Sequence, residues 1–245
     1  MTQPSTNGGT PASSGRTPAQ GNRLDPWYDV YADRAHNLRA SEIRALFSVV
    51  SRPEVVSLAG GMPNLKDLPL DKLAASAEKL VRNHGAQAMQ YGSGQGWEVL
   101  RERITEVMGY DGIVGADPDD VVVTTGSQQA LDLVTELFVN PGDVILAEAP
   151  SYVGALGVFR ARQADIVHVP MDEHGIIPEA LEETIRSVRA SGRTIKFIYI
   201  IPNYHNPAGV TLSAERRPII AEICLREHVL IVEDNPYGLL GFHSD

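Results

Sequence analysis

The sequence predicts an α/β fold with a largely parallel sheet. Short runs of β-branched and aliphatic residues alternate along the chain with longer segments whose apolar residues recur at helical spacing. Two such runs, residues 195–201 and 229–232, flank a helical segment and end in turn residues, which is typical of buried parallel strands. Strand, helix and strand in this order form a right-handed crossover unit. This alternation is what assigns the chain to the α/β class.

Composition limits the kinds of partner. The 245 residues carry a formal net charge of −10, which disfavours nucleic acid and anionic membrane surfaces as partners. No run of about 18 apolar residues occurs, and the first twenty residues hold no apolar segment, so we expect neither a membrane span nor a secretory signal. The single cysteine, Cys224, falls at helical spacing with Ile220 and Ile223, which predicts a buried thiol. The expected location is the cytoplasm.

The first sixty residues divide into two segments. Residues 1–23 are polar and rich in Pro, Gly and Ser, which predicts a disordered tail. Residues 24–60 no longer have the polar composition of the tail. Within them, Ser41 is positioned to cap a helix that continues to about residue 51. A glycine turn follows. There, Gly61 either lets the backbone approach a ligand or only makes a tight turn.

A helical region and a glycine loop come next. Residues 70–83 have the apolar periodicity of an amphipathic helix, and a second helix carries Leu100, Ile104 and Val107. The loop at 91–96 contains three glycines, as phosphate-binding loops often do. No strand leads directly into it and no Lys-Ser/Thr pair follows, so it is neither a P-loop nor a dinucleotide fingerprint.

The following segment predicts a site for an anion. Residues 121–125 read as a buried strand, Gly126 makes the turn, and a helix begins at Ser127. The first turn of a helix has unpaired backbone N–H groups and the positive end of the helix dipole, which favour a phosphate. Ser127 is equally well explained as an ordinary N-cap.

The middle of the chain continues the alternation. Strands are expected at 144–147 and 166–169, and a helix at 178–190. Pro150 and Ser151 turn the chain and put Tyr152 at the start of a helix. After the strand at 195–201, a helix capped by Ser213 is expected, with Pro218 in its second turn, where it removes one backbone hydrogen bond.

Polar and aromatic residues follow several predicted strand ends. Besides the helix start after Gly126, these are Tyr152, Asn206, Asp234 and Tyr237. Ligands of parallel sheets bind at the carboxyl ends of the strands, so these groups describe a ligand with a phosphate, a flat ring and a polar ring edge. A carboxylate beside a ring nitrogen favours its protonated form, which a pyridoxal phosphate cofactor needs. The predicted cofactor is pyridoxal 5′-phosphate.

A set of motifs now carries a resemblance to a known family. The chain resembles the class I/II aminotransferases of pyridoxal-phosphate fold type I, close to the aminoadipate/kynurenine-type branch. The matching motifs stand in family order and spacing at residues 57–63 (SLAGGMP), 90–92 (QYG), 125–131 (TGSQQAL), 150–152 (PSY), 202–209 (PNYHNPAG) and 233–237 (EDNPY). Each motif alone is weak, but the set is highly specific.

The resemblance implies roles for the groups around the phosphate and the substrate. Ser127 and Gln128 would bind the cofactor phosphate, and Tyr152 would stack on the pyridine ring. Gly61 would meet the substrate carboxylate. Tyr91 would reach the phosphate of the neighbouring subunit, which implies a homodimer in the full-length form.

It also implies roles at the ring edge. Asn206 and Tyr237 would bind the ring hydroxyl oxygen, and Asp234 would pair with the ring nitrogen. Asn203 and His205 lie within the motif, but we assign them no role.

One family feature is missing. Family chemistry uses a lysine that forms a Schiff base with the cofactor, a few tens of residues beyond Tyr237. The chain ends at Asp245, and its lysines, none of which matches that position, are Lys66, Lys72, Lys79 and Lys196. The expected protein is therefore an N-terminal portion, truncated before its last strands and the C-terminal small domain, and inactive by itself. In this reading residues 24–60 form an N-terminal arm and part of the small domain, and residues 61–245 an incomplete large domain.

The implied activity is transfer of an amino group from an amino acid to a 2-oxo acid. A pyridoxal-phosphate lyase or decarboxylase would share the same motifs. A non-catalytic binding or regulatory module is a third possibility, but regulators with this fold carry a DNA-binding winged helix in front of it. Here the front is a polar tail.

Overall fold

The computed structural model describes residues 25–36, 54–56, 65 and 67–241. The chain separates into two compact units, residues 1–38 and 39–245. In the first unit, the described elements are a 3-10 helix, η1 (Tyr28–Val30), and a short α-helix, α1 (Asp33–His36). The predicted helix after Ser41 and the glycine turn at Gly61 lie outside the described residues.

The second unit contains a five-stranded sheet, which confirms the predicted α/β class. The strands stand in the order β3-β2-β1-β4-β5, and every neighbouring pair is parallel except β2 and β3. Their bounds are β1 (Val144–Ala149), β2 (Asp165–Asp172), β3 (Gly175–Ile176), β4 (Ile195–Ile200) and β5 (Leu230–Glu233). The chain places β2 on one side of β1 and then crosses to place β4 on the other side. Such a reversal creates a crevice at the carboxyl ends of the two strands.

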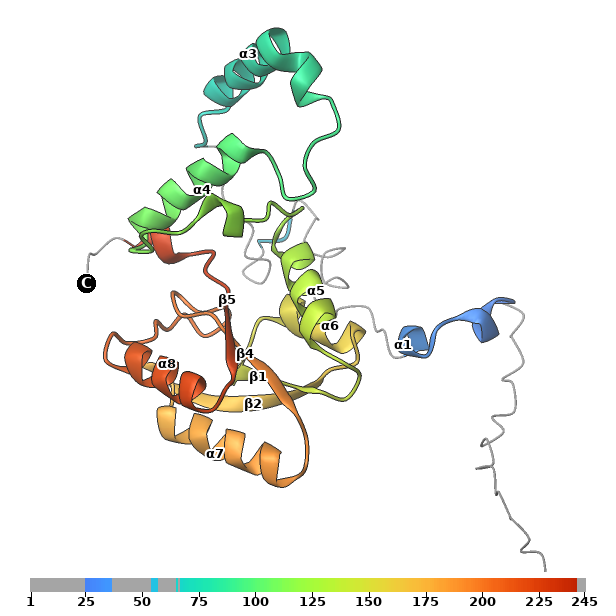
Figure 1. Ribbon diagram of the computed structural model, residues 1–245, viewed down its shortest axis with the longest axis vertical. Helices are drawn as coiled ribbons and strands as arrows, with labels where there is room; N and C mark the ends of the chain where they lie inside the picture. The colour runs from blue at the N-terminus through green and yellow to red at the C-terminus, as the bar shows by residue number, and fades with distance from the viewer. Residues whose placement is uncertain (1–24, 37–53, 57–64, 66, 242–245) are drawn as a thin grey trace, which may run out of the picture. The chain divides into compact units, whose positions relative to one another are not determined.

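Helices cover both faces of the sheet (Figure 1). They are α5 (Ser127–Phe138), α6 (Val153–Ala161), α7 (Pro178–Ala190) and α8 (Arg216–Arg226). Helices α5 and α6 lie on one face, and α7 and α8 on the other. Helix α6 connects β1 to β2, whereas α7 and α8 connect strands that follow in the opposite direction across the sheet. Because all these crossovers are right-handed, the two directions place their helices on opposite faces.

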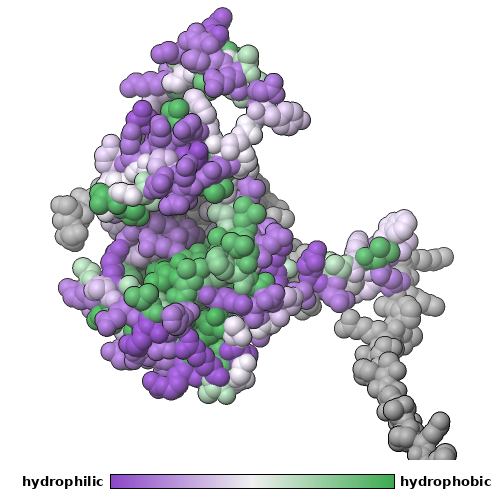
Figure 2. Space-filling model, in the orientation of Figure 1, coloured by the Kyte–Doolittle hydropathy of each residue, from purple (hydrophilic) through white to green (hydrophobic). Residues whose placement is uncertain are grey.

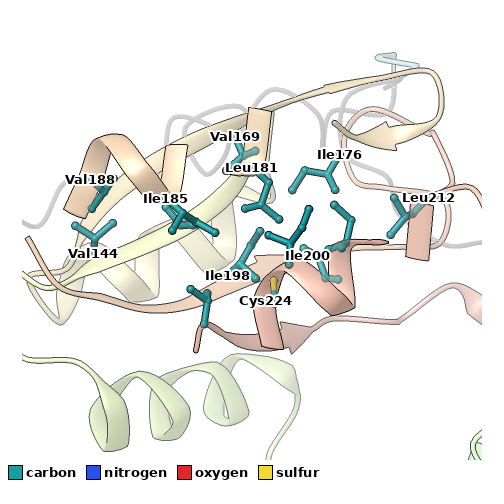
Figure 3. Packing of buried hydrophobic residues seen from close by; sticks show 14 residues of the cluster. Val144, Val169, Ile176, Leu181, Ile185, Val188, Ile198, Ile200, Leu212 and Cys224 are labelled. Atoms are coloured by element: carbon teal, nitrogen blue, oxygen red, sulfur yellow. The ribbon is translucent and has the colours of Figure 1, made fainter. Parts of the chain in front are cut away.

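Alternate residues of the central strands fill two separate cores. Val144 and Leu146 of β1 pack toward α7 and α8, whereas Ile145 and Ala147 pack toward α5 and α6. This is the two-residue period of a strand that is buried on both faces. Figure 3 shows the first core, in which Cys224 lies among aliphatic side chains. Cys224 is 1% exposed, as predicted, and burial raises the pKa of its thiol to about 11.

The predicted strand at 121–125 is wrong. These residues are not part of the sheet, and Val122 is 56% exposed. A strand needs a neighbour that completes its hydrogen-bond ladder, and no described strand lies beside this segment. The N–H of Val123 instead donates to the carbonyl of Gln95, at 2.8 Å, in the glycine loop.

The predicted effect of Pro218 is also wrong. Helix α8 begins at Arg216, two residues later than a cap at Ser213 would give. The N–H groups of Arg216 and Arg217 donate to the Ser213 carbonyl as a turn before the helix is established. Pro218 is therefore the third helical residue, where a backbone N–H has no partner within the helix, and it removes no helical bond.

Two longer helices precede the sheet. Helix α3 (Leu70–Ala88) extends the predicted helix at 70–83, and its φ/ψ are non-helical at His84. Helix α4 (Glu98–Tyr110) follows the glycine loop as expected, and the predicted turn before residue 121 is a 3-10 helix, η2 (Pro118–Asp120). The apolar residues of α3 remain exposed, for example Leu73 at 66%. In the part of the chain that is described, no helix combines the length and apolar character required to cross a membrane.

Candidate cofactor site

Five of the predicted site residues line a single pocket at the carboxyl ends of the strands. The pocket has a volume of about 220 Å³, and its wall consists of Ser127, Tyr152, Ile201, Asn206, Asp234, Pro236 and Tyr237. Tyr152 follows β1, Asn206 follows β4, and Asp234 with Tyr237 follows β5. Ser127 comes from the start of α5. The pocket therefore combines groups from four segments that are distant in sequence, at the edge where a parallel sheet binds ligands.

The start of α5 supplies the anion-binding end of the pocket. Gly126 has φ 78° and ψ 168°, a combination that is essentially restricted to glycine, and this turn aims the helix at the pocket. Gly126 occupies the N-cap position and Ser127 is the first helical residue, so the alternative of Ser127 as the N-cap is wrong. The side chain of Gln129 accepts the N–H of Thr125 at 2.6 Å, which fixes the turn. The first N–H groups of α5 and the Ser127 hydroxyl remain for an anion.

The aromatic wall depends on a glycine that the sequence analysis did not single out. Tyr152 is the N-cap of α6, and its ring lies over Gly154. A Cβ atom at Gly154 would lie 2.7 Å from Cε1 of Tyr152 and closer still to Cζ. Only glycine leaves room for the ring in this position. In the sequence, the signal for this arrangement is a glycine two residues after Tyr152, at the start of a predicted helix.

Asp234 is held from both sides. Its N–H donates to the carbonyl of Ile200 at 2.9 Å, and its Oδ2 accepts the hydroxyl of Tyr199 at 2.6 Å. Burial, and next the hydrogen bond to Asp234, raise the pKa of Tyr199 far above its usual value, so Tyr199 keeps its proton and donates. Among the described residues no group donates to Oδ1, so this oxygen remains for a cationic ring edge. Tyr199 is the one aromatic hydroxyl in an otherwise apolar strand end, and its need for a partner could have been recognised.

The turn that carries Asn206 is fixed by a network of amides. The side chain of Asn203 donates to Asn235 Oδ1 at 2.9 Å and accepts from Arg217 Nη2 at 2.7 Å. Asn235 in turn donates to Asp111 at the end of α4. Asn203, which we had given no role, therefore joins the turn after β4 to the turn after β5. These two turns carry Asn206 and Asp234, so the hydrogen bond fixes one relative to the other.

A buried acid–imidazole pair lies under the same turn. Glu148 and His205 are 1% and 2% exposed, and Glu148 Oε2 lies 3.1 Å from His205 Nε2. The same oxygen accepts the N–H of Ile201 at 2.8 Å. The sequence assigns no role to His205 and does not mark Glu148, because only the fold brings the end of β1 under the turn after β4.

Three predicted residues are not part of the pocket wall. Gln128 is exposed at the start of α5. Tyr91 is fully exposed and lines a different cavity, beside Trp97 and Arg101. Gly61 lies outside the described residues. Their roles stay predictions.

None of the described lysines belongs to the pocket wall. Lys72 and Lys79 lie on α3. Lys196 is near the amino end of β4, the opposite edge of the sheet, with its Nζ 3.3 Å from Asp143 Oδ2. No lysine occurs among the residues that form the pocket wall.

Comparison with known proteins identifies the family. The family model for aminotransferase class I and II matches residues 53–245. The chain belongs to this family. That match confirms the resemblance found in the sequence, and it covers all the described residues of the pocket.

Individual relatives point to one branch of the class I/II aminotransferases. The aromatic-amino-acid aminotransferase 1 of Thermococcus litoralis is 38% identical over 215 residues, which is 88% of this chain and 52% of that protein. The 2-aminoadipate transaminase of Thermus thermophilus is 35% identical over 216 residues, with the same two coverages of 88% and 52%. The chain thus spans about half the length of the curated relatives it matches.

A solved structure agrees with the fold. The kynurenine aminotransferase of Pyrococcus horikoshii, solved with PMP, superposes with a TM-score of 0.83 at 34% identity, over 91% of this chain and 55% of that one. This similarity confirms the predicted fold type I architecture with a mainly parallel sheet. The cofactor of the family is pyridoxal 5′-phosphate, as predicted from the site residues.

Proposed function

We propose that this chain forms the cofactor-binding part of a pyridoxal-phosphate aminotransferase, which transfers an amino group from an amino acid to a 2-oxo acid. The observation that carries the proposal is the convergence of Ser127, Tyr152, Asn206, Asp234 and Tyr237 on one pocket. An anion site, an aromatic face, two hydrogen-bonding groups and a carboxylate are the groups that a phosphorylated hydroxypyridine requires. The relatives favour amino transfer over the lyase, decarboxylase and non-catalytic alternatives.

Each residue has a distinct task in this proposal. The start of α5, with Ser127 and Gln128, holds the phosphate. Tyr152 covers a face of the ring, and Asn206 and Tyr237 bind the ring hydroxyl oxygen. Asp234, oriented by Tyr199, accepts a hydrogen bond from the protonated ring nitrogen and so favours the charged ring. When bound, the cofactor supplies the electron sink that amino transfer needs.

The remaining predictions belong to the complete enzyme. Gly61 meets the substrate carboxylate. In a homodimer, Tyr91 reaches the phosphate in the partner subunit, and its full exposure is compatible with that role. Residues 24–60 act as an arm and part of a small domain, and residues 61–245 as the cofactor-binding domain.

The 245-residue chain by itself should bind the cofactor but should not sustain transamination. The pocket wall contains no lysine that could form the Schiff base or carry a proton between substrate and cofactor. The check is an amino-transfer assay on the purified chain with its mass confirmed. Sustained turnover would contradict this part of the proposal.

Cofactor binding is tested by titrating the purified chain with pyridoxal 5′-phosphate and following the absorbance of the ring. The wild-type chain should bind saturably, and Asp234→Ala and Asn206→Ala should each bind about tenfold more weakly or worse, because each removes a polar partner of the ring. Thr135→Val is the matched control, because Thr135 is a buried hydroxyl of α5 that bonds the Leu131 carbonyl and is absent from the pocket wall. Equal affinities in all four proteins would overturn the assignment of the pocket.

A further inference from the structure

Glu148 contacts two points of the chain that both precede the pocket residue Asn206. It is the fifth residue of β1, and its side chain is 1% exposed. One carboxylate oxygen, Oε2, accepts the backbone N–H of Ile201 at 2.8 Å and lies 3.1 Å from Nε2 of His205. Ile201 belongs to the pocket wall, and His205 directly precedes Asn206. A single buried atom therefore contacts both ends of the segment that leads to Asn206.

The surroundings of His205 define which nitrogen faces Glu148. Its Nδ1 accepts the N–H of Ala208 at 3.3 Å, which requires a lone pair on Nδ1 and places the imidazole proton on Nε2. The nitrogen that carries this proton lies 3.1 Å from Glu148 Oε2. The Nε2 to Oε2 approach is close but poorly aligned for a hydrogen bond, so the contact is mainly an electrostatic attraction. The backbone of His205 is fixed as well, by its N–H to the Val210 carbonyl at 2.8 Å.

Simple packing does not explain a carboxylate in this position. Burying a charged group is costly unless it is compensated by polar partners, and an apolar side chain would fill the same space at lower cost. What an apolar side chain cannot do is accept the N–H of Ile201 and attract the ring of His205 at once. The carboxylate therefore matters for the geometry of this turn.

We propose that Glu148 is a positioning residue that acts through His205 and Ile201 to set where Asn206 meets the ring oxygen of the cofactor. This proposal rests on the proposed function of the pocket. It assigns Glu148 no contact with the cofactor, because Glu148 is absent from the pocket wall.

The first test uses the cofactor-free chain and measures hydrogen–deuterium exchange of peptides that cover residues 201–210. Glu148→Ala should accelerate exchange in this segment, because the Ile201 N–H and the His205 ring lose their shared partner. Glu148→Gln, which keeps an acceptor oxygen for Ile201, should have a smaller effect of the same kind. Thr135→Val, a buried change in α5, should leave the segment unchanged. Unchanged exchange in Glu148→Ala would overturn the proposal whether or not the chain binds a cofactor.

The second test is a double-mutant cycle on the affinity for pyridoxal 5′-phosphate. Glu148→Gln should weaken binding about fivefold in the wild-type background but less than about twofold when Asn206 is already alanine, because coupled residues are not additive. A purely structural effect of Glu148 would weaken binding by the same factor in both backgrounds, and that result would overturn the proposal. If the wild-type chain does not bind the cofactor, the proposed function fails, and the exchange experiment alone decides the role of Glu148.

Discussion

At the scale of single residues, the pocket depends as much on small and supporting side chains as on those that would touch a ligand. Asp234 is oriented by Tyr199, and the ring of Tyr152 has its place only because residue 154 is a glycine. These supporting residues carry no obvious motif. They were found from distances, because each one is defined by a contact with another element or by free space beside a ring.

Gly154→Ala should weaken cofactor binding without a comparable loss of stability. The added methyl group would overlap the Tyr152 ring and displace it from the pocket wall. We expect about five- to tenfold weaker binding of pyridoxal 5′-phosphate, which corresponds to the loss of one aromatic contact. The absorbance titration checks this. The control is Gly157→Ala in the same helix, where an added Cβ atom meets nothing within 4 Å. Equal effects of the two substitutions would contradict the role of Gly154.

At the scale of elements, short irregular segments decide where the helices point. Helix α5 reaches the pocket only after the sharp turn at Gly126, and α8 starts only after a separate turn at Ser213. Helix α7 was predicted to the residue because Pro178 at its first position marks the start. The starts of α3 and α5 were also predicted to the residue, whereas the start of α8 was misplaced by two residues.

Gly126→Ala should destabilise the folded chain by about 1–3 kcal/mol, the usual cost of a strained backbone conformation for a residue with a Cβ atom. The added methyl group itself meets nothing within 4 Å, so the cost comes from φ 78° and ψ 168° alone. Denaturant unfolding measures the change. Gly109→Ala, in α4, also points into open space and is the control. A change of the same size in both variants would show that the turn conformation is not the cause.

The ion pair between Asp172 and Arg216 should make the free energy of unfolding depend on pH in the acidic range. Arg216 donates to both carboxylate oxygens, at 2.6 and 2.8 Å, and with the N–H of His174 it lowers the pKa of Asp172 to about 2. A lowered pKa in the folded state means that the contribution to stability is complete above the unfolded value, about 4, and is lost as the pH falls toward 2.

The free energy of unfolding of the wild-type chain should therefore decrease between about pH 4 and pH 2 more steeply than that of Asp172→Asn. Urea unfolding at several pH values gives both curves. Asp120→Asn, an exposed change in η2, should leave the slope as in the wild type. Parallel curves for the wild type and Asp172→Asn would show that the pair does not contribute.

At the scale of the whole molecule, sequence patterns predicted the fold class and most elements, because those depend on local periodicity. Tyr152, Asn206, Asp234 and Tyr237 were predicted because each follows a strand end, and parallel strands bring such ends together. Ser127 was predicted as the start of a helix. The strand at 121–125 failed, because strand formation depends on a neighbour that local pattern does not reveal. The Glu148–His205 and Tyr199–Asp234 contacts were missed for the same reason: each joins segments from different parts of the chain.

The strands should differ in how well their backbone amides are protected. Strand β1 lies in the middle of the sheet with parallel neighbours on both sides, and Val144 to Ala147 are fully buried. Within the described residues β5 pairs only with β4, and its Leu230 is 45% exposed. Figure 2 shows apolar surface over this part of the molecule. Three large apolar side chains of α5 are exposed: Leu133, Leu137 and Phe138.

Amide exchange in β5 should accordingly be faster than in β1 by at least about tenfold, because edge strands open locally at lower cost. Hydrogen–deuterium exchange with peptide resolution measures both strands in one experiment, with β4 as the internal reference. Equal protection of β1 and β5 would contradict the edge position of β5.

The edge position of β5 has a consequence for the ligand. Asp234 follows directly after this edge strand, whereas Tyr152 follows the central strand and Ser127 begins a helix on one face. A molecule that binds all three joins an edge strand of the described sheet to its central strand and to α5. Its binding energy is then added to the stability of the closed sheet in proportion to the logarithm of its concentration. The cofactor would thus act as a structural brace for the protein as well as a reagent.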